Sequence, residues 1–189
     1  MTARDARTLA PLADFYVAAG HPLPAVETVG HDELPPALRD LLSAPRPLTP
    51  RLEDHHGESL ALRVLERRRD GDRYARRIVL VRGDGVPVVL GAIAIDLVRL
   101  TPALRAEVLA EEVPFGHILA TATATARPDA LLRVQCDAFI ADALELSPRR
   151  DLQLYGRRRT LVDAEGATMA TVVEILAPEP PASASKTGS

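Results

Sequence analysis

The last third of the chain contains two β-type runs joined by a short turn. The first run covers residues 151–162, the second covers residues 167–178, and the turn segment between them carries a glycine. Antiparallel pairing across this turn places Glu174 opposite the stretch 155–157, within about one residue. The residues that share the parity of Glu174 are apolar, so this carboxylate is expected on the packed face of the strand. A carboxylate in that position needs a partner or a function.

The rest of the chain predicts helices first and then mostly hairpin-linked strands. We expect helices within residues 1–20, 36–44, 50–57, 113–120 and 137–146 and from Pro102 onward, with Thr49 and Thr101 as N-caps. We expect further strands at residues 60–69, 73–82, 86–97 and 131–135. Residues 21–33 are predicted to be an irregular connection. This order predicts an α+β fold, with an antiparallel sheet of about six strands and helices packed on one face.

Length and composition indicate one folded domain with a short tail. The chain has 189 residues, and we expect a single domain at residues 1–178 followed by a disordered, low-complexity tail at residues 179–189. Hydrophobic residues make up 47% of the chain but aromatic residues only 3%, so the core is expected to be aliphatic. The net charge of −3 argues against nucleic acid as a partner.

The sequence argues against an internal disulfide, a membrane helix, a metal site and a nucleotide cofactor. The single cysteine, Cys136, has no partner for an internal disulfide, which fits a reducing cytoplasm. No run approaches the ~18 consecutive apolar residues of a membrane helix. The five histidines and Cys136 form no metal-ligand pattern, and no glycine-rich nucleotide motif is present. We therefore expect no metal and no cofactor, and a monomer or weak dimer.

Four blocks of sequence occur in an order that is similar to a known enzyme family. They are Leu48-Thr49 followed by Arg51-Leu52, the strand and turn at residues 73–87, Pro114-Phe115-Gly116, and the closing hairpin with its Gly-Arg-Arg strand and Glu174. In this order they resemble the chorismate pyruvate-lyases, which make 4-hydroxybenzoate. The resemblance covers residues 38–178.

The resemblance implies a reaction and a set of site residues. The reaction is a cofactor-free elimination of pyruvate from chorismate, in which positioning and charge pairing supply most of the catalysis. Arg77 would bind the ring carboxylate, because counting back without gaps from Asp84-Gly85 places it on the family's arginine. The backbones of Leu48 and Phe115 would add contacts, and Gly116 would permit a close approach. Glu174 would lie at the C4 hydroxyl and the departing oxygen.

Each of these residues also has a purely structural interpretation. Arg76 and Arg77 point to opposite faces of their strand, and both could be surface arginines. Glu174 could form a cross-strand ion pair with Arg157 or Arg159. Parity alone does not decide which residue of the run 157–159 faces the site. Leu48 and Phe115 could be ordinary core residues beside turns.

The chain also departs from the family pattern, which leaves other functions open. The long central strand carries Gly91-Ala92 where the family often has Gly-Arg, and the segment 128–153 is longer than in short bacterial lyases. One alternative is an effector or sensor domain of the same fold that binds a small aryl acid. Another is a divergent lyase-fold enzyme of specialised metabolism, acting on a related enolpyruvyl or aryl acid.

Overall fold

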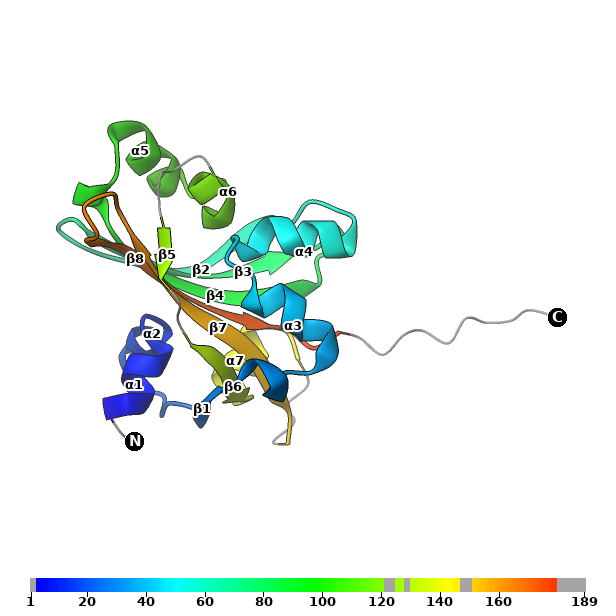
Figure 1. The fold of residues 1–189 in the computed structure, drawn as a ribbon. Helices are drawn as coiled ribbons and strands as arrows, with labels where there is room; N and C mark the ends of the chain where they lie inside the picture. The colour runs from blue at the N-terminus through cyan, green and yellow to red at the C-terminus, as the bar shows by residue number, and fades with distance from the viewer. Residues whose placement is uncertain (1–2, 121–124, 128–129, 147–150, 180–189) are drawn as a thin grey trace.

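The computed structural model describes residues 3–120, 125–127, 130–146 and 151–179 (Figure 1). Within these residues the helices are α1 (Ala3–Leu9), α2 (Leu12–Ala18), α3 (Pro36–Ser43), α4 (Leu48–His56), α5 (Pro102–Ala110), α6 (Phe115–Ala120) and α7 (Ala138–Ala143). Short 3₁₀ turns occur at η1 (His31–Glu33) and η2 (Leu97–Arg99). The strands are β1 (Val26–Val29), β2 (Ala61–Asp70), β3 (Arg73–Val81), β4 (Pro87–Asp96), β5 (Thr125–Arg127), β6 (Leu131–Gln135), β7 (Gln153–Val162) and β8 (Thr168–Leu176).

These strands form one antiparallel sheet, which confirms the predicted α+β class. Seven of them follow the order β1-β6-β7-β8-β4-β3-β2. The short strand β5 pairs with residues 160–162 of β7, while β6 pairs with residues 153–157 of the same strand. The structure therefore adds β1 and β5 to the strands expected from the sequence. β1 lies inside the connection that was predicted to be irregular, and it is held by pairing with β6.

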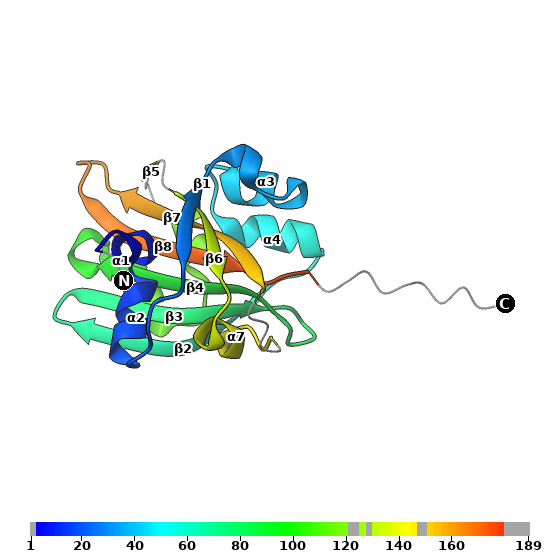
Figure 2. The same ribbon diagram turned by 90° about the horizontal axis from the view of Figure 1, so that it is seen from below.

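Helices cover both faces of the sheet, whereas the sequence predicted helices on one face only (Figures 1 and 2). Helices α1, α2 and α7 pack on one face, where Val79 belongs to their hydrophobic cluster. Helices α3 and α4 pack on the other face, against Ile78 and Leu80. Because neighbouring residues of a strand point to opposite faces, β3 contributes to the hydrophobic packing on both faces of the sheet. The prediction of one covered face is wrong because it assigned no partner to the apolar N-terminal helix.

The N-terminal segment forms two short helices instead of the single helix expected within residues 1–20. Pro11 is the N-cap residue of α2, and a proline there cannot donate the hydrogen bond that would continue α1. One side of the segment is apolar, and its members are fully buried in the core: Leu9, Leu12, Phe15 and Tyr16.

Helices α3 and α4, which precede β2, end close to where the sequence predicts, but α4 begins earlier in the chain than expected. Helix α3 begins at Pro36, and α4 is followed by the C-cap residue Gly57, whose φ of 70° suits a glycine. The N-cap of α4 is Pro47, so Thr49 lies in the first turn rather than at the cap. Thr49 is buried, and its side chain packs against α6 instead.

The closing hairpin has the register that the sequence predicts. Arg157 pairs with Glu174, and Gly156 pairs with Ile175. A Cβ atom on Gly156 would lie only 2.2 Å from the carbonyl oxygen of Glu174. Glycine at this position therefore permits the close approach of β7 to β8 beside the candidate site residue.

Two predicted features fall partly outside the described residues. Residues 180–189 of the expected tail lie outside them, as do residues 128–129 and 147–150 of the long segment. Within that segment the structure describes β6 and α7, as expected. Of the helices that the structure describes, none has the length and apolar character needed to cross a membrane.

Candidate ligand-binding site

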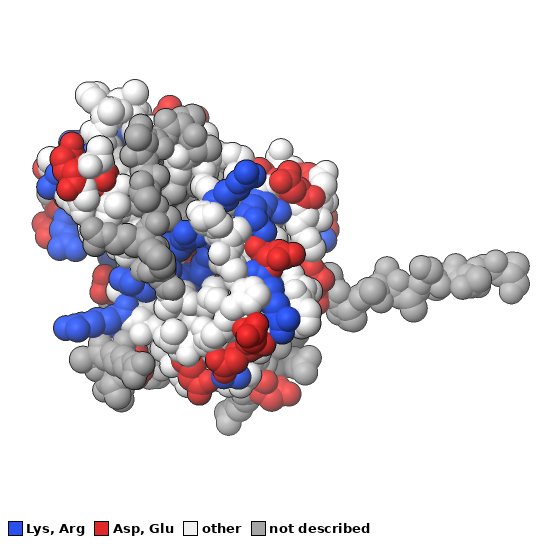
Figure 3. Space-filling model, viewed as in Figure 1, with Lys and Arg blue, Asp and Glu red and all other residues white. Residues whose placement is uncertain are grey.

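A cavity lies on the face of the sheet that α3, α4 and α6 cover. Its volume is about 170 Å³, close to that of an engineered apolar cavity of about 150 Å³ that binds benzene. The space-filling view shows a hollow on this side of the molecule, with basic side chains gathered in it (Figure 3). The described residues that line the cavity are Pro45, Arg46, Pro47, Thr49, Leu62, Arg76, Ile78, Leu80, Val89, Gly91, Ala92, Ile93, Pro114, Phe115, Gly116, Leu119, Arg157, Arg159, Leu161, Val172 and Glu174.

The floor of the cavity consists of two neighbouring cross-strand rows. The first row is Arg76, Ile93, Val172 and Arg159, and the second is Ile78, Gly91, Glu174 and Arg157, on β3, β4, β8 and β7 respectively. Gly91 has no side chain, and a Cβ there would lie 3.0 Å from Cδ1 of Ile78. The middle of the floor is therefore low and apolar, with charged residues toward its edges.

Arg76 is a buried cation without a close counter-ion among the described residues. Its exposure is 1%. Nη1 and Nη2 donate long hydrogen bonds, of 3.5 Å to the Val108 carbonyl and 3.4 Å to the Val113 carbonyl, and Nε donates to no described group. The Tyr74 side chain also interacts with the guanidinium. Burial lowers the pKa of the Arg76 guanidinium, while Tyr74 and Glu111 act in the opposite direction. An arginine still remains protonated, so the cavity contains a positive charge in an apolar setting.

Arg77 lies on the opposite face of the sheet, which corrects the prediction that it shares a cavity with Glu174. Its guanidinium carbon is 4.1 Å from the centre of the Phe139 ring, and Nη2 is 3.9 Å from a carboxylate oxygen of Glu66. These contacts belong to the core under α2 and α7. The arginine that faces the cavity is its neighbour, Arg76.

Glu174 lines the cavity and also forms the cross-strand ion pair with Arg157. Its Oε2 accepts a hydrogen bond of 2.7 Å from Nε of Arg157. The side chain of Arg157 is 3% exposed and that of Glu174 is 17% exposed. The pair is therefore largely buried. Arg157 compensates the charge of Glu174 and fixes the carboxylate against the cavity floor.

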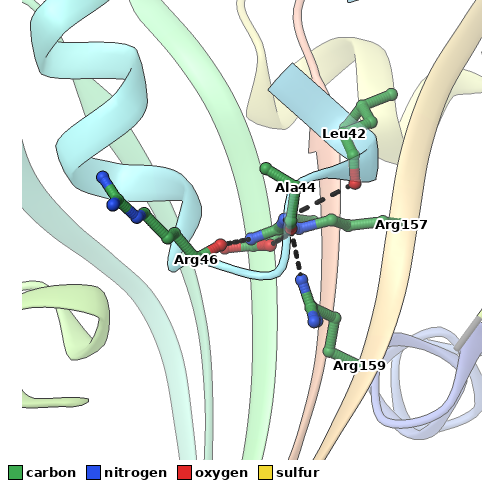
Figure 4. A network of polar contacts seen from close by, with 6 residues as sticks. Leu42, Ala44, Arg46, Arg157 and Arg159 are labelled. Carbon is green, nitrogen blue, oxygen red and sulfur yellow. Dashed lines mark hydrogen bonds and ion pairs between the residues drawn. The ribbon is translucent and has the colours of Figure 1, made fainter. Parts of the chain in front are cut away.

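Arg157 and Arg159 also hold the connection between α3 and α4 over the sheet (Figure 4). Arg157 donates to the carbonyl oxygens of Leu42 at 3.5 Å, Ala44 at 3.1 Å and Arg46 at 3.3 Å. Arg159 donates to the Ala44 carbonyl at 2.6 Å. We call residues 42–46 the strap. The two arginines therefore form one wall of the cavity by orienting this backbone.

The other predicted site residues lie at or near the roof. Phe115 and Gly116 line the cavity, and a Cβ on Gly116 would lie 2.6 Å from Oγ1 of Thr49. Gly116 therefore allows α6 to approach α4 closely. Leu48 does not line the cavity; it is 1% exposed and packs in the hydrophobic cluster of α3 and α4. Its neighbours Pro47 and Thr49 line the cavity instead.

The sequence did not single out the strap or assign a site role to Arg76. Parity in β7 groups Arg157, Arg159 and Leu161 on one face, which is a usable signal. No local pattern, however, indicates that the strap carbonyls would meet this face. No cluster of side chains suited to a metal ion occurs within the described residues.

Comparison with known proteins gives a partial likeness of fold only. No family model and no curated protein matches the sequence. Among solved structures, the chain is similar to the ligand-binding domain of a GntR-family transcriptional regulator from Bordetella bronchiseptica. The identity is 18% and the TM-score 0.47, over 64% of this chain and 86% of that chain.

Two further solved structures show the same degree of likeness. The effector domain of PhnF from Mycobacterium smegmatis has 16% identity and a TM-score of 0.49, over 67% of this chain and 85% of that chain. The C-terminal domain of the histidine utilization repressor from Pseudomonas syringae pv. tomato has 11% identity and a TM-score of 0.45, over 62% of this chain and 90% of that chain. The match to another crystal structure of PhnF, with a longer chain, covers 61% of that chain. These likenesses concern the arrangement of strands and helices, so the function has to follow from the chemistry of the cavity.

Proposed function

We propose that the cavity binds a small cyclic carboxylic acid and that Arg76 binds its carboxylate. The observation that supports this most is the state of Arg76, which is 1% exposed and whose hydrogen bonds to the Val108 and Val113 carbonyls are long, at 3.5 and 3.4 Å. Burying a cation without a partner costs free energy. A carboxylate can accept two parallel hydrogen bonds from one guanidinium, which would compensate that cost.

The remaining walls suit an aromatic or other flat ring with a polar substituent. Ile93 and Val172 supply an apolar floor, and Gly91 leaves room above it. Glu174 is on the second strand along from that of Arg76 and in the neighbouring cross-strand row. The Cα atoms of the two residues are therefore roughly 12 Å apart. A hydroxyl group on the far side of the ring could donate to the Glu174 carboxylate. A 4-hydroxy aryl acid therefore combines the required groups.

The binding function is tested by calorimetry with 4-hydroxybenzoate and with 4-hydroxybenzamide, its neutral analogue of nearly equal shape. We expect one molecule of the acid to bind per chain. The amide should bind about 10- to 150-fold more weakly, because it loses charge-assisted hydrogen bonds worth about 1.5–3 kcal/mol. Equal affinity for the acid and the amide, or no binding of either to folded protein, would contradict the proposal.

A second candidate function is chorismate pyruvate-lyase activity, and it is favoured by Glu174 lining the same cavity as Arg76. In that reaction the ring carbon–oxygen bond to the enolpyruvyl group breaks and the ring loses the C4 proton as it becomes aromatic. Enolpyruvate then takes up a proton to give pyruvate. A positioned carboxylate near the C4 hydroxyl could assist the proton transfer.

Product analysis separates the two functions. A lyase should release pyruvate and 4-hydroxybenzoate from chorismate in equal amounts, without added metal or nucleotide. In that case Glu174→Gln should lower turnover by about 100-fold or more, while 4-hydroxybenzoate affinity changes little because the amide oxygen can still accept a hydrogen bond. If the folded protein binds 4-hydroxybenzoate but releases no pyruvate, the protein is a binding module and the lyase candidate fails.

A further inference from the structure

A short polar chain links Arg76 in the cavity to the surface of the protein. The Tyr74 hydroxyl donates a hydrogen bond to Oε1 of Glu111, and Oε2 of Glu111 pairs with Nη1 of Arg67 at 2.9 Å. The Tyr74 side chain also interacts with the Arg76 guanidinium. Of these four residues, only Arg76 lines the cavity. Tyr74 and Glu111 can therefore act on a ligand only through Arg76.

Tyr74 and Glu111 lie on the side of Arg76 that faces the connection between α5 and α6. Tyr74 precedes Arg76 by two residues on β3, so both side chains point to the same face of the sheet. Glu111 is the C-cap residue of α5, and Arg76 donates to the carbonyls of Val108 and Val113 on either side of it in the chain. Tyr74 is 4% exposed and the Glu111 side chain is 13% exposed. The polar chain is therefore shielded from water where it meets the guanidinium.

The chemistry of the two groups fixes the direction of their hydrogen bond. An ionised carboxylate can only accept, so the phenol proton of Tyr74 points toward Glu111. Burial and this hydrogen bond raise the pKa of Tyr74 to about 12, so the hydroxyl keeps its proton at neutral pH. The lone pairs of the hydroxyl oxygen then remain for a donor, and the neighbouring guanidinium of Arg76 consists entirely of donors.

A fixed guanidinium matters for a ligand that binds through a carboxylate. The two parallel hydrogen bonds between an arginine and a carboxylate need one orientation of the guanidinium plane. An arginine side chain loses conformational entropy when it is held in that orientation, and the loss counts against binding unless it has already occurred in the free protein. A neutral amide forms weaker hydrogen bonds with a guanidinium, so it gains less from the same orientation.

We infer that Tyr74 is a positioning residue which, held by Glu111, fixes the Arg76 guanidinium for the carboxylate of the ligand. This inference rests on the proposed function, because it requires a carboxylate at Arg76. Part of the preference of the cavity for an acid over its neutral analogue is then set by a residue that does not line the cavity.

Calorimetry of Tyr74→Phe with 4-hydroxybenzoate and 4-hydroxybenzamide tests this role. The variant removes one hydroxyl and keeps the ring in its hydrophobic cluster. Affinity for the acid should fall about 3- to 12-fold, which corresponds to the net contribution of one hydrogen bond, while affinity for the amide should change by less than about two-fold. A purely structural role would instead weaken the acid and the amide equally.

Tyr16→Phe is the matched control for the loss of a buried hydroxyl. Tyr16 is fully buried, and its hydroxyl donates to a carboxylate oxygen of Asp137 at 2.8 Å in the core on the opposite face of the sheet. This variant should leave both affinities unchanged to within about two-fold. An equal loss of acid affinity in Tyr16→Phe and Tyr74→Phe would show that the effect is not specific to Arg76.

Substitution of Glu111 tests how the hydroxyl is held. Glu111→Leu removes the acceptor and should lower the affinity for the acid about as much as Tyr74→Phe does. Glu111→Gln keeps an oxygen that can accept the Tyr74 proton, so it should retain most of that affinity. If Glu111→Gln weakens acid binding as much as Glu111→Leu, the carboxylate acts through its charge, and the inference that it holds the Tyr74 hydroxyl is wrong.

A measurement on the unmodified protein does not depend on how the variants fold. The chain has three tyrosines and no tryptophan, so ¹³C labelling of the tyrosine Cζ atoms gives a simple NMR spectrum, which Tyr16→Phe and Tyr155→Phe assign. Addition of 4-hydroxybenzoate should shift the Tyr74 signal and leave the Tyr16 signal in place. The benzamide should shift the Tyr74 signal less.

The outcomes separate this inference from the proposed function. If the unmodified protein prefers the acid but Tyr74→Phe keeps the full preference, or if the acid leaves the Tyr74 signal unmoved, the inference is wrong while the proposed function stands. If the acid and the amide bind to the unmodified protein equally well, or if neither binds, the proposed function fails and the inference fails with it.

Discussion

Replacing Arg76 by methionine should abolish measurable binding of 4-hydroxybenzoate without lowering the stability of the ligand-free protein. Truncating one partner of a buried, hydrogen-bonded charge pair costs about 2–5 kcal/mol of binding free energy, which is about 30- to 4,000-fold in Kd. Stability should not fall, because the hydrogen bonds of Arg76 to backbone carbonyls are long in the free protein. Replacing a buried ion by an apolar side chain of similar volume is often neutral or stabilising. Glu111 would keep its ion pair with Arg67, at 2.9 Å.

The measurements for this variant are calorimetric titration with 4-hydroxybenzoate and urea unfolding of the free protein. Arg77→Met is the matched control, since it removes the neighbouring guanidinium from the opposite face of the sheet. That control should keep its affinity for the acid to within about two-fold, although loss of the cation–π contact with Phe139 can cost about 1–2 kcal/mol of stability. If Arg77→Met abolishes binding and Arg76→Met does not, the assignment of Arg76 to the ligand is wrong.

Replacing Arg157 by methionine should lower the free energy of unfolding by about 3–5 kcal/mol, because removal of one partner leaves a buried charge uncompensated. Arg157 is 3% exposed and donates to Glu174 as well as to three strap carbonyls. Its loss therefore leaves a largely buried carboxylate and several backbone acceptors without their donor. A domain of this size is typically stable by about 5–15 kcal/mol, so the change would be a large fraction of the total.

Urea unfolding followed by circular dichroism measures this loss, and two further variants show its origin. Arg63→Met is the surface control: Arg63 pairs with Glu145 at 2.7 Å with both side chains about half exposed, and such pairs contribute at most about 1 kcal/mol. The double variant Arg157→Met with Glu174→Leu should recover part of the loss, since no uncompensated carboxylate remains. A single variant Arg157→Met within about 1 kcal/mol of the unmodified protein would show that the pair does not stabilise the fold.

The sequence predicts those features of the site that depend on strand alternation and on a short hairpin turn. The position of Glu174 follows from alternation in a strand that pairs without interruption from Ala170 to Leu176. The register of its hairpin follows from the turn at residues 163–166. Both rest on patterns that extend over a few neighbouring residues, which a single sequence displays directly.

The choice between Arg76 and Arg77 could not be made in the same way. Counting back from Asp84-Gly85 matched Arg77 to the family's arginine without gaps, but such a match does not say which face of the strand the residue occupies. Alternation within β3 is regular, with Val79 in the core under α1, α2 and α7 and Ile78 and Leu80 in the core under α3 and α4. The strand therefore offers one arginine to each face, and only the packing of the helices shows which face encloses the cavity.

The strap lay beyond prediction for a different reason. The carbonyl groups that Arg157 and Arg159 bind are 111 to 115 residues away in the chain. Backbone acceptors carry no residue-specific signal, so nothing in residues 42–46 marks them as partners of an arginine. Only the folded arrangement, in which α3 packs against β7, brings these groups together (Figure 1).

The two-sided sheet has a consequence for how this protein could change over evolutionary time. Adjacent positions on one strand serve different purposes: Leu90 belongs to the core under α1, α2 and α7, while Gly91 forms the cavity floor. Mutations at cavity positions such as Ile93 or Val172 can therefore reshape ligand selectivity while the opposite core, which contains Phe15 and Phe139, keeps the domain folded. The same separation gives a protein engineer a set of alternating positions at which new specificities can be explored one strand at a time.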